Sequence, residues 1–254
     1  AAGLMLWTVI AVLPTTSAGA APVPTPYSAA AGGDVVGLGV DLVGFELAGV
    51  QLAHSESAVD SAGTPRSQAV ARDLAASVAG LSVVPTTSSQ TAPPDNAAPT
   101  EGIIPTVNVP VLGLGLGMIQ ASTHARWPGD AACVSPSGAL SATRAETAGA
   151  SLRPVGLVEI LSTGVASTTG TTRLAATGQP GDNRAVEAQA IGSIDAISVL
   201  NGAVKIEVVG DPTVTATATG TPGGATATYA PPVVRVHVGG SVTTIPAGGS
   251  LGPI

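Results

Sequence analysis

Apolar and small polar residues alternate along most of this chain. The clearest case is the segment VKIEVV at residues 204–209, in which every second position before the last is apolar. Such alternation places the apolar residues on one face of a β-strand and the polar residues on the other. The pattern therefore predicts strands.

A similar arrangement of strands recurs along the chain, although not at a fixed period. Each unit has an apolar strand punctuated by glycine, then a strand rich in Ser, Thr and Ala, then a turn and a return strand of similar composition. The units begin with GLGVDLV at 37, VPVLGLG at 109, RPVGLVE at 153 and GAVKIEV at 202. We therefore expect an all-β fold of antiparallel β-hairpin units, packed as a sandwich or an elongated sheet stack.

Two return segments also fit a helix. Val70, Leu74 and Val78 would lie on one helical face, and so would Ile191 and Ile194. By analogy with the fourth unit, we interpret both segments as strands.

Composition divides the chain into five segments. Residues 1–20, with the apolar run LMLWTVIAVL and an A-x-A motif, are predicted to be a signal peptide truncated at its start. Residues 21–33 are expected to form a Pro-rich arm and residues 34–84 the first β unit. Residues 85–105, rich in Pro, Ser and Thr, read as a linker or long loop. Residues 106–254 hold the remaining β units, which we expect to form one domain with 34–84.

These segments predict an exported protein that is extracellular or located at the cell surface. No apolar run beyond the N-terminal one is long enough to predict a membrane span. The net charge is −7 and basic residues do not cluster, which argues against a nucleic-acid partner. Cys133 is the single cysteine, so no intramolecular disulfide is expected.

The stretch VTATATGTPGGATATY, residues 214–229, reads almost the same in both directions around a turn. With a four-residue turn, Thr217 lies opposite Thr226 and Thr215 lies opposite Thr228. Directly opposed residues share a face, so one face of this hairpin is rich in Thr and the other in Ala. These four threonines are the candidate binding face of the chain.

The Thr face has several interpretations. Regular Thr-x-Thr ladders are used by ice-binding β-proteins, and an exposed sheet face also suits a carbohydrate-binding module. Only 2% of the residues are aromatic, however, and carbohydrate sites usually use exposed aromatic rings. A solvated face of β-branched residues is the explanation that the pattern favours.

Candidate catalytic chemistry is sparse in this sequence. His54, His124 and His237 lie far apart, and His54 would share a strand face with Glu56. A hydrolase would need one of these histidines beside a serine and a carboxylate. No residue is assigned as catalytic, cofactor-binding or metal-binding, and no cofactor is expected, because no metal-ligand spacing is present.

Residues 185–234 and the segments THARW and CVSPSGALSATRAETAGASL resemble a diffuse group of exported actinobacterial proteins, some of which carry the "choice-of-anchor" label. In that group, strands rich in Ala, Ser and Thr surround a core strand of the type S-V-L-x-G-x-V, which matches residues 198–204 here. The resemblance implies an exported, surface-associated protein and supplies no catalytic residues.

We therefore expect a structural or adhesive β-protein of the cell surface, without catalytic activity. Its partners would be components of the cell envelope or other copies of itself. The alternatives are an extracellular hydrolase that uses a His/Ser/carboxylate site and a carbohydrate- or ice-binding module that uses the Thr-rich face.

Overall fold

The computed structural model describes residues 26–42, 45–78, 81–83, 87–109, 113–128, 138–153, 158–176, 184–220 and 223–249. Every secondary-structure element in these ranges is a β-strand, and every strand pairing is antiparallel. The predicted all-β class is thus confirmed. Within the described ranges there is no helix able to cross a bilayer.

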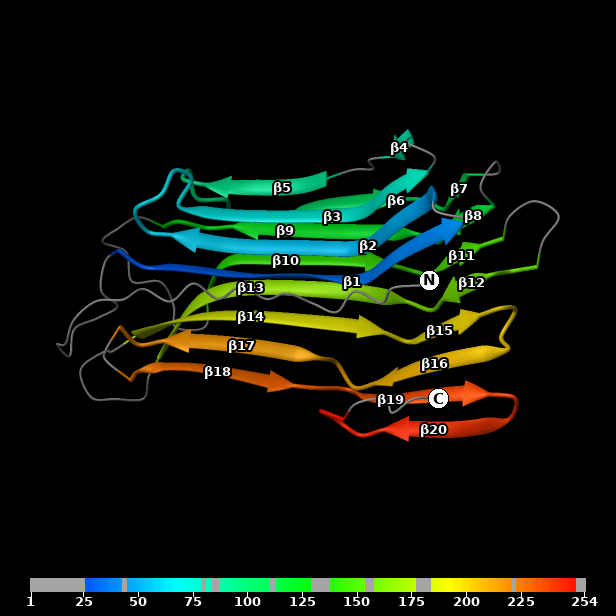
Figure 1. Cartoon of the computed structure of the whole chain (residues 1–254). Helices are drawn as coiled ribbons and strands as arrows, with labels where there is room; N and C mark the ends of the chain where they lie inside the picture. Colours follow the sequence, from blue (N-terminus) through cyan, green and yellow to red (C-terminus); the bar gives the residue numbers. More distant parts are fainter. Residues whose placement is uncertain are drawn as a thin grey trace.

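The described strands form three sheets (Figure 1). Sheet A has the order β1-β2-β3-β4, and β5 also pairs with β3. Its strands are β1 (Ser28–Leu42), β2 (Phe45–Asp60), β3 (Ser67–Val78), β4 (Leu81–Val83) and β5 (Thr87–Ala92).

Sheet B has the order β18-β17-β14-β13-β10-β9-β6. Its strands are β6 (Thr100–Ile104), β9 (Ile119–Ala125), β10 (Ala139–Thr147), β13 (Ala166–Ala176), β14 (Arg184–Ile194), β17 (Thr213–Ala218) and β18 (Ala225–Ala230).

Sheet C has the order β20-β19-β16-β15-β12-β11-β8-β7. Its strands are β7 (Val107–Val109), β8 (Leu114–Leu116), β11 (Ala150–Leu152), β12 (Leu161–Thr163), β15 (Ala196–Val199), β16 (Val204–Val209), β19 (Val233–Val238) and β20 (Ser241–Ile245).

Sheets B and C lie at opposite ends of one antiparallel meander. A strand of sheet B continues after a short break into a strand of sheet C, as β14 continues into β15 and β18 into β19 (Figure 1). Pro231 and Pro232 form the second of these breaks, where the missing N–H groups end the ladder. The apolar strands of units two to four lie in sheet C and their small-residue strands lie in sheet B, so the change of composition marks the break.

Sheet A lies face to face on sheet B. β1 packs against β13 and β14, β2 against β10 and β13, and β3 against β9 and β10. The side chains between the sheets are small: Ala53, Ala71, Ala121 and Ala145 form one buried cluster. A sandwich filled by methyl groups gains little free energy from each side chain, because a buried CH₂ contributes only about 0.8 kcal/mol.

Hydroxyl groups bridge the two sheets. Ser57 Oγ donates to Ser141 O at 2.9 Å, and Ser67 Oγ donates to Leu140 O at 2.7 Å. In the opposite direction, Thr168 Oγ1 of sheet B donates to Ala53 O at 3.1 Å. A serine hydroxyl ends two bonds from its Cα, so these contacts require a sheet spacing below the usual value of about 10 Å.

Sheet A and sheet B approach each other closely at Gly170. A Cβ atom added there would lie 2.9 Å from Ala31 O, 2.9 Å from Thr143 Oγ1 and 3.3 Å from Ser57 Cβ. Two of these neighbours belong to the facing sheet, so even one methyl group would press the sheets apart.

The segment boundaries differ from the sequence expectations. β1 begins at Ser28, inside the expected Pro-rich arm of residues 21–33. The stretch 85–105 is not a bare linker or loop, since it supplies β5 and β6. Its small hydroxyl side chains suit this interior: Ser88 is buried and its Oγ lies 2.9 Å from Thr123 Oγ1 of sheet B. The expected signal peptide, residues 1–20, lies outside the described residues.

The two ambiguous segments are strands, as predicted. Residues 67–78 form β3 and residues 184–194 form β14, each paired on both sides. Tertiary pairing decides such cases, because the apolar spacing alone fits both structures.

We expect Gly170→Ala to destabilise the protein by about 1–3 kcal/mol, because the added methyl overpacks the contact between the sheets. Gly102→Ala is the matched control in sheet B, since its Cβ would meet only Ala121 Cβ, at 4.0 Å. The control should stay within about 1 kcal/mol of the parent. Urea unfolding followed by circular dichroism measures both, and equal effects would contradict the close approach at Gly170.

Candidate binding surface

The register predicted for the Thr hairpin is confirmed. Thr215 lies opposite Thr228, and Thr217 lies opposite Thr226. Ala216 of β17 points inward and is buried, whereas all residues of β18 are exposed. Sheet A explains the difference: its first strand, β1, lies against β13 and β14 and so stops short of β18.

The Thr face of the hairpin continues across the outer face of sheet B, the face turned away from sheet A. Strand pairing aligns one row of opposed residues across six strands of the sheet. From the open edge inward this row is Thr228, Thr215, Gln189, Thr171, Ala142 and His124. Gln189 Nε2 donates to Thr215 Oγ1 at 3.2 Å, so these two neighbours in the row are also joined by a side-chain hydrogen bond.

The rows on either side are mostly polar, although Ile191 on β14 interrupts one of them. The other contains Thr217, Glu187 and Arg173, and the Arg173 guanidinium lies 2.6 Å from Glu187 Oε1. The regular Thr-x-Thr array is therefore confined to β17 and β18, because β14 interrupts it with Glu187 and Gln189. What extends over the sheet is a broad surface of hydroxyl, amide and paired charged groups.

The three histidines lie on three different strands and take different partners. His54 Nδ1 lies 2.8 Å from Asp34 Oδ1, on the outer face of sheet A. His237 Nε2 lies 3.2 Å from Glu207 Oε2 in sheet C. Within the described part of the chain, no histidine is hydrogen-bonded to a serine hydroxyl.

The partner of His54 differs from the residue that the sequence suggested. His54 and Glu56 lie on one strand face as expected, but Asp34, directly opposite on β1, makes the contact. Arg72 of β3 is opposite His54 on its other side. The register of the β1–β2 hairpin would have identified the Asp34–His54 pair. The sequence did not predict this register, because β1 begins inside the segment that is expected to be an arm.

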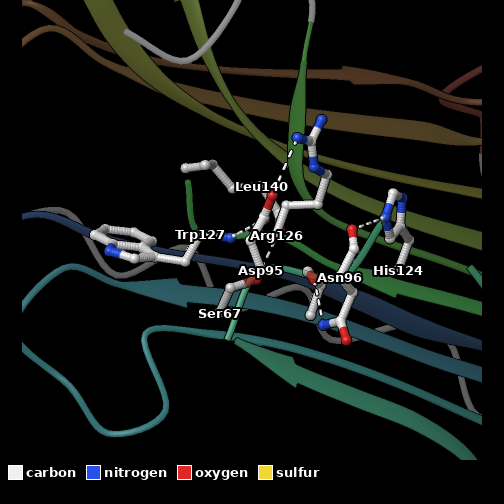
Figure 2. Close-up of polar contacts among 8 residues, drawn as sticks. Ser67, Asp95, Asn96, His124, Arg126, Trp127 and Leu140 are labelled. Carbon is white, nitrogen blue, oxygen red and sulfur yellow. Dashed lines mark hydrogen bonds and ion pairs between the residues drawn. The ribbon is translucent and has the colours of Figure 1, made fainter. Parts of the chain in front are cut away.

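His124 belongs to a network of hydrogen bonds along one edge of the sandwich, shown in Figure 2. Its Nε2 lies 3.0 Å from Asn96 O, while Asn96 Nδ2 donates to Ala125 O at 2.7 Å. Asp95 Oδ1 accepts from the Trp127 backbone N–H at 2.7 Å. Asp95 and Asn96 lie in the connection from β5 to β6, so these contacts fix the crossover from sheet A to sheet B.

Several of the large buried side chains gather in one cluster of the sandwich. Tyr27 and Trp127 lie with ring centroids 6.4 Å apart, and both pack with Leu140. The Arg66 guanidinium carbon lies 5.3 Å from the centroid of the Trp127 ring. Burial raises the pKa of the Tyr27 phenol, and the nearby Arg66 charge opposes this shift in part.

A cluster of charged side chains lies on sheet C. Lys205 Nζ is 2.7 Å from Glu207 Oε1. The hydrogen bond from Lys205 first, and then the nearby His237 imidazole, hold the pKa of Glu207 below its usual range. Lys205 and Glu207 lie on β16, and His237 lies on the neighbouring strand β19. The three side chains form a partly exposed ion-pair network, in which His237 has a structural role.

No group of three or more potential metal ligands occurs among the described residues. Cys133 lies outside the described ranges. No protein-family model matches the chain, and comparisons with curated proteins and with solved structures give no match either.

Alkaline pH should destabilise the protein through Tyr27. A pKa raised by folding means that the folded state prefers the protonated phenol, so its contribution is complete below the ordinary value of 10.0 and is lost above it. The chain has two tyrosines, so Tyr229→Phe leaves Tyr27 as the single phenol.

In Tyr229→Phe, the phenolate absorbance of the folded protein should therefore rise with a midpoint above 10.0, and unfolding in urea should bring the midpoint back toward that value. In Tyr27→Phe, the loss of stability above pH 10 should be smaller than in the parent. A folded midpoint at or below 10.0 would contradict the burial of this phenol.

Proposed function

We propose that the protein is an exported structural or adhesive protein of the cell surface, which contacts the cell envelope through the outer face of sheet B. The observation that carries the proposal is the row of mostly polar side chains from Thr228 to His124 across that face. The expected export signal and the resemblance to exported actinobacterial proteins support the same location.

The chemistry of this face suits a polymer of hydroxyl and amide groups. Thr and Gln side chains both donate and accept hydrogen bonds, and the opposed Arg173–Glu187 pair leaves little net charge. Thr is stiff at χ1, so binding costs little side-chain entropy. Since the face is broad, many weak contacts would add up to adhesion.

A hydrolase remains the second candidate because of the Asp34–His54 pair. A carboxylate on Nδ1 orients a histidine so that Nε2 can act as a base. The pair lies on the outer face of sheet A, where both side chains are partly exposed, at 41% and 28%. A hydrolase would use this face, whereas the adhesive function uses the opposite one.

Binding to washed actinobacterial cell-wall fragments tests the adhesive function. We expect the protein to sediment with the fragments and Thr171→Arg to lower the bound fraction at least tenfold, because a long charged side chain then stands in the centre of the outer face. Ser89→Arg is the matched control, since Ser89 is exposed and lies opposite Val70 on the other outer face of the sandwich.

Circular dichroism must show that both variants are folded. A protein that stays in the supernatant, or an equal loss for the two variants, would refute adhesion through this face. Glycan arrays and a thermal-hysteresis measurement with the same variants separate a carbohydrate- or ice-binding module from a general adhesin.

For the second candidate, the expected result is no turnover of ester, amide or glycoside substrates by the purified protein. Hydrolysis that disappears in both His54→Ala and Asp34→Asn, and persists in His237→Ala, would replace the adhesive function with a hydrolase.

A further inference from the structure

Among the described strands, none pairs with the outer edge of β18. β18 ends the strand order of sheet B, and its partner among the described strands is β17. All of its residues are exposed, and its sequence, ATATYA, contains no charge and no proline. Natural edge strands are usually protected by such residues. At the opposite edge, β6 carries Glu101, and Gln90 donates to its Thr100 hydroxyl at 2.7 Å.

The hairpin geometry determines which backbone groups face the open edge. Thr219 N donates to Gly224 O at 3.0 Å, which makes these two residues a hydrogen-bonded pair. Hydrogen-bonded pairs recur at every second position of an antiparallel ladder. Thr226 and Thr228 therefore bond to β17. The residues whose N–H and C=O groups point to the open edge are Ala225, Ala227 and Tyr229.

We propose that β18 pairs with β18 of a second copy of this chain, antiparallel, about a twofold axis that passes beside Ala227. Ala227 then forms a hydrogen-bonded pair with Ala227 of the second copy, and Ala225 pairs with Tyr229. Thr226 lies opposite Thr228. Every outward backbone group of the strand finds a partner in this register.

The sequence is self-complementary in this register. Thr226 opposite Thr228 repeats the Thr–Thr pairs that β17 and β18 already form within one chain. A slip by one residue would place Ala opposite Thr and would misalign the bonding groups. A slip by two residues keeps the faces but leaves more of this short strand unpaired.

Such pairing extends the candidate binding face. The row Thr217–Thr226 continues into Thr228 and Thr215 of the second copy, so the regular Thr array spans four strands in place of two. The inference concerns self-association and does not rest on the proposed adhesive function. If both hold, the dimer doubles the adhesive surface.

The association must be weak in dilute solution. One short strand of small residues buries far less than the roughly 800 Å² per partner that stable interfaces require. Dimers would form at high local concentration, as on a surface, so the test must trap them.

Mixed disulfide trapping reports the register. Thr226→Cys and Thr228→Cys are made separately in a Cys133→Ser background, which removes the single native cysteine. In a non-hydrogen-bonded pair the Cα atoms lie about 4.5 Å apart, within reach of a disulfide. The mixture should give a covalent dimer under mild oxidation, at least tenfold more than either variant alone.

Edge variants supply the controls. Ala227→Lys, introduced into both cysteine variants, should abolish the dimer, while Val242→Lys should leave it, because Val242 is exposed on β20 at the edge of sheet C. Circular dichroism checks that the lysine variants are folded. Since Ala227 is itself exposed, the lysine does not enter the core.

Three results would overturn the proposal. Equal trapping of the single variants would indicate unspecific edge contact. A dimer that survives Ala227→Lys would place the contact elsewhere. A dimer that appears only after removal of residues 250–254 would show that the edge is covered within one chain.

Discussion

Short hydroxyl side chains that reach the backbone of the facing sheet set the spacing of this sandwich, and the remaining structure follows from that spacing. Ser57 and Ser67 bond across in one direction and Thr168 in the other. Buried hydroxyls cost free energy unless they are hydrogen-bonded, so each such bond also satisfies its own donor. Where the sheets are this close, small side chains lie between them, and at Gly170 even a methyl group would meet Ala31 O and Ser57 Cβ of sheet A.

The unusual composition of the chain is a consequence of this interior. Alanine, serine and threonine occupy most of the inner positions, in keeping with an aromatic content of only 2%. The larger side chains of Trp127, Tyr27 and Leu140 gather in one cluster, where Arg66 covers the Trp127 ring. Ser55 Oγ and Thr147 Oγ1 are also buried, and neither forms a hydrogen bond to another described residue. Stability is thus spread over many small contacts.

The same chemistry decides what the sequence could predict. Alternation of Thr and Ala was sufficient for the register of β17 and β18, because a slip would exchange the two faces. The prediction of a linker or loop for 85–105 is wrong, because a lack of apolar residues normally indicates a loop. The interior between sheets A and B, however, accepts Ser88 and its neighbours. The Asp34–His54 contact depends on the pairing of β1 with β2, and the stacking of sheet A on sheet B depends on contacts between distant segments. Neither is encoded in a local pattern.

The limited width of sheet A also explains why β18 differs from the other strands of its sheet. Because β1 lies over β13 and β14, the inner face of β18 is left uncovered and its alanines are exposed. Burial therefore contributes little to this strand, and its order rests on the ladder to β17, where each hydrogen bond contributes about 0.5–1.5 kcal/mol. A strand with two exposed faces can gain further stability only along its open edge. The Thr face and the open edge thus have one structural cause, the end of the covering sheet.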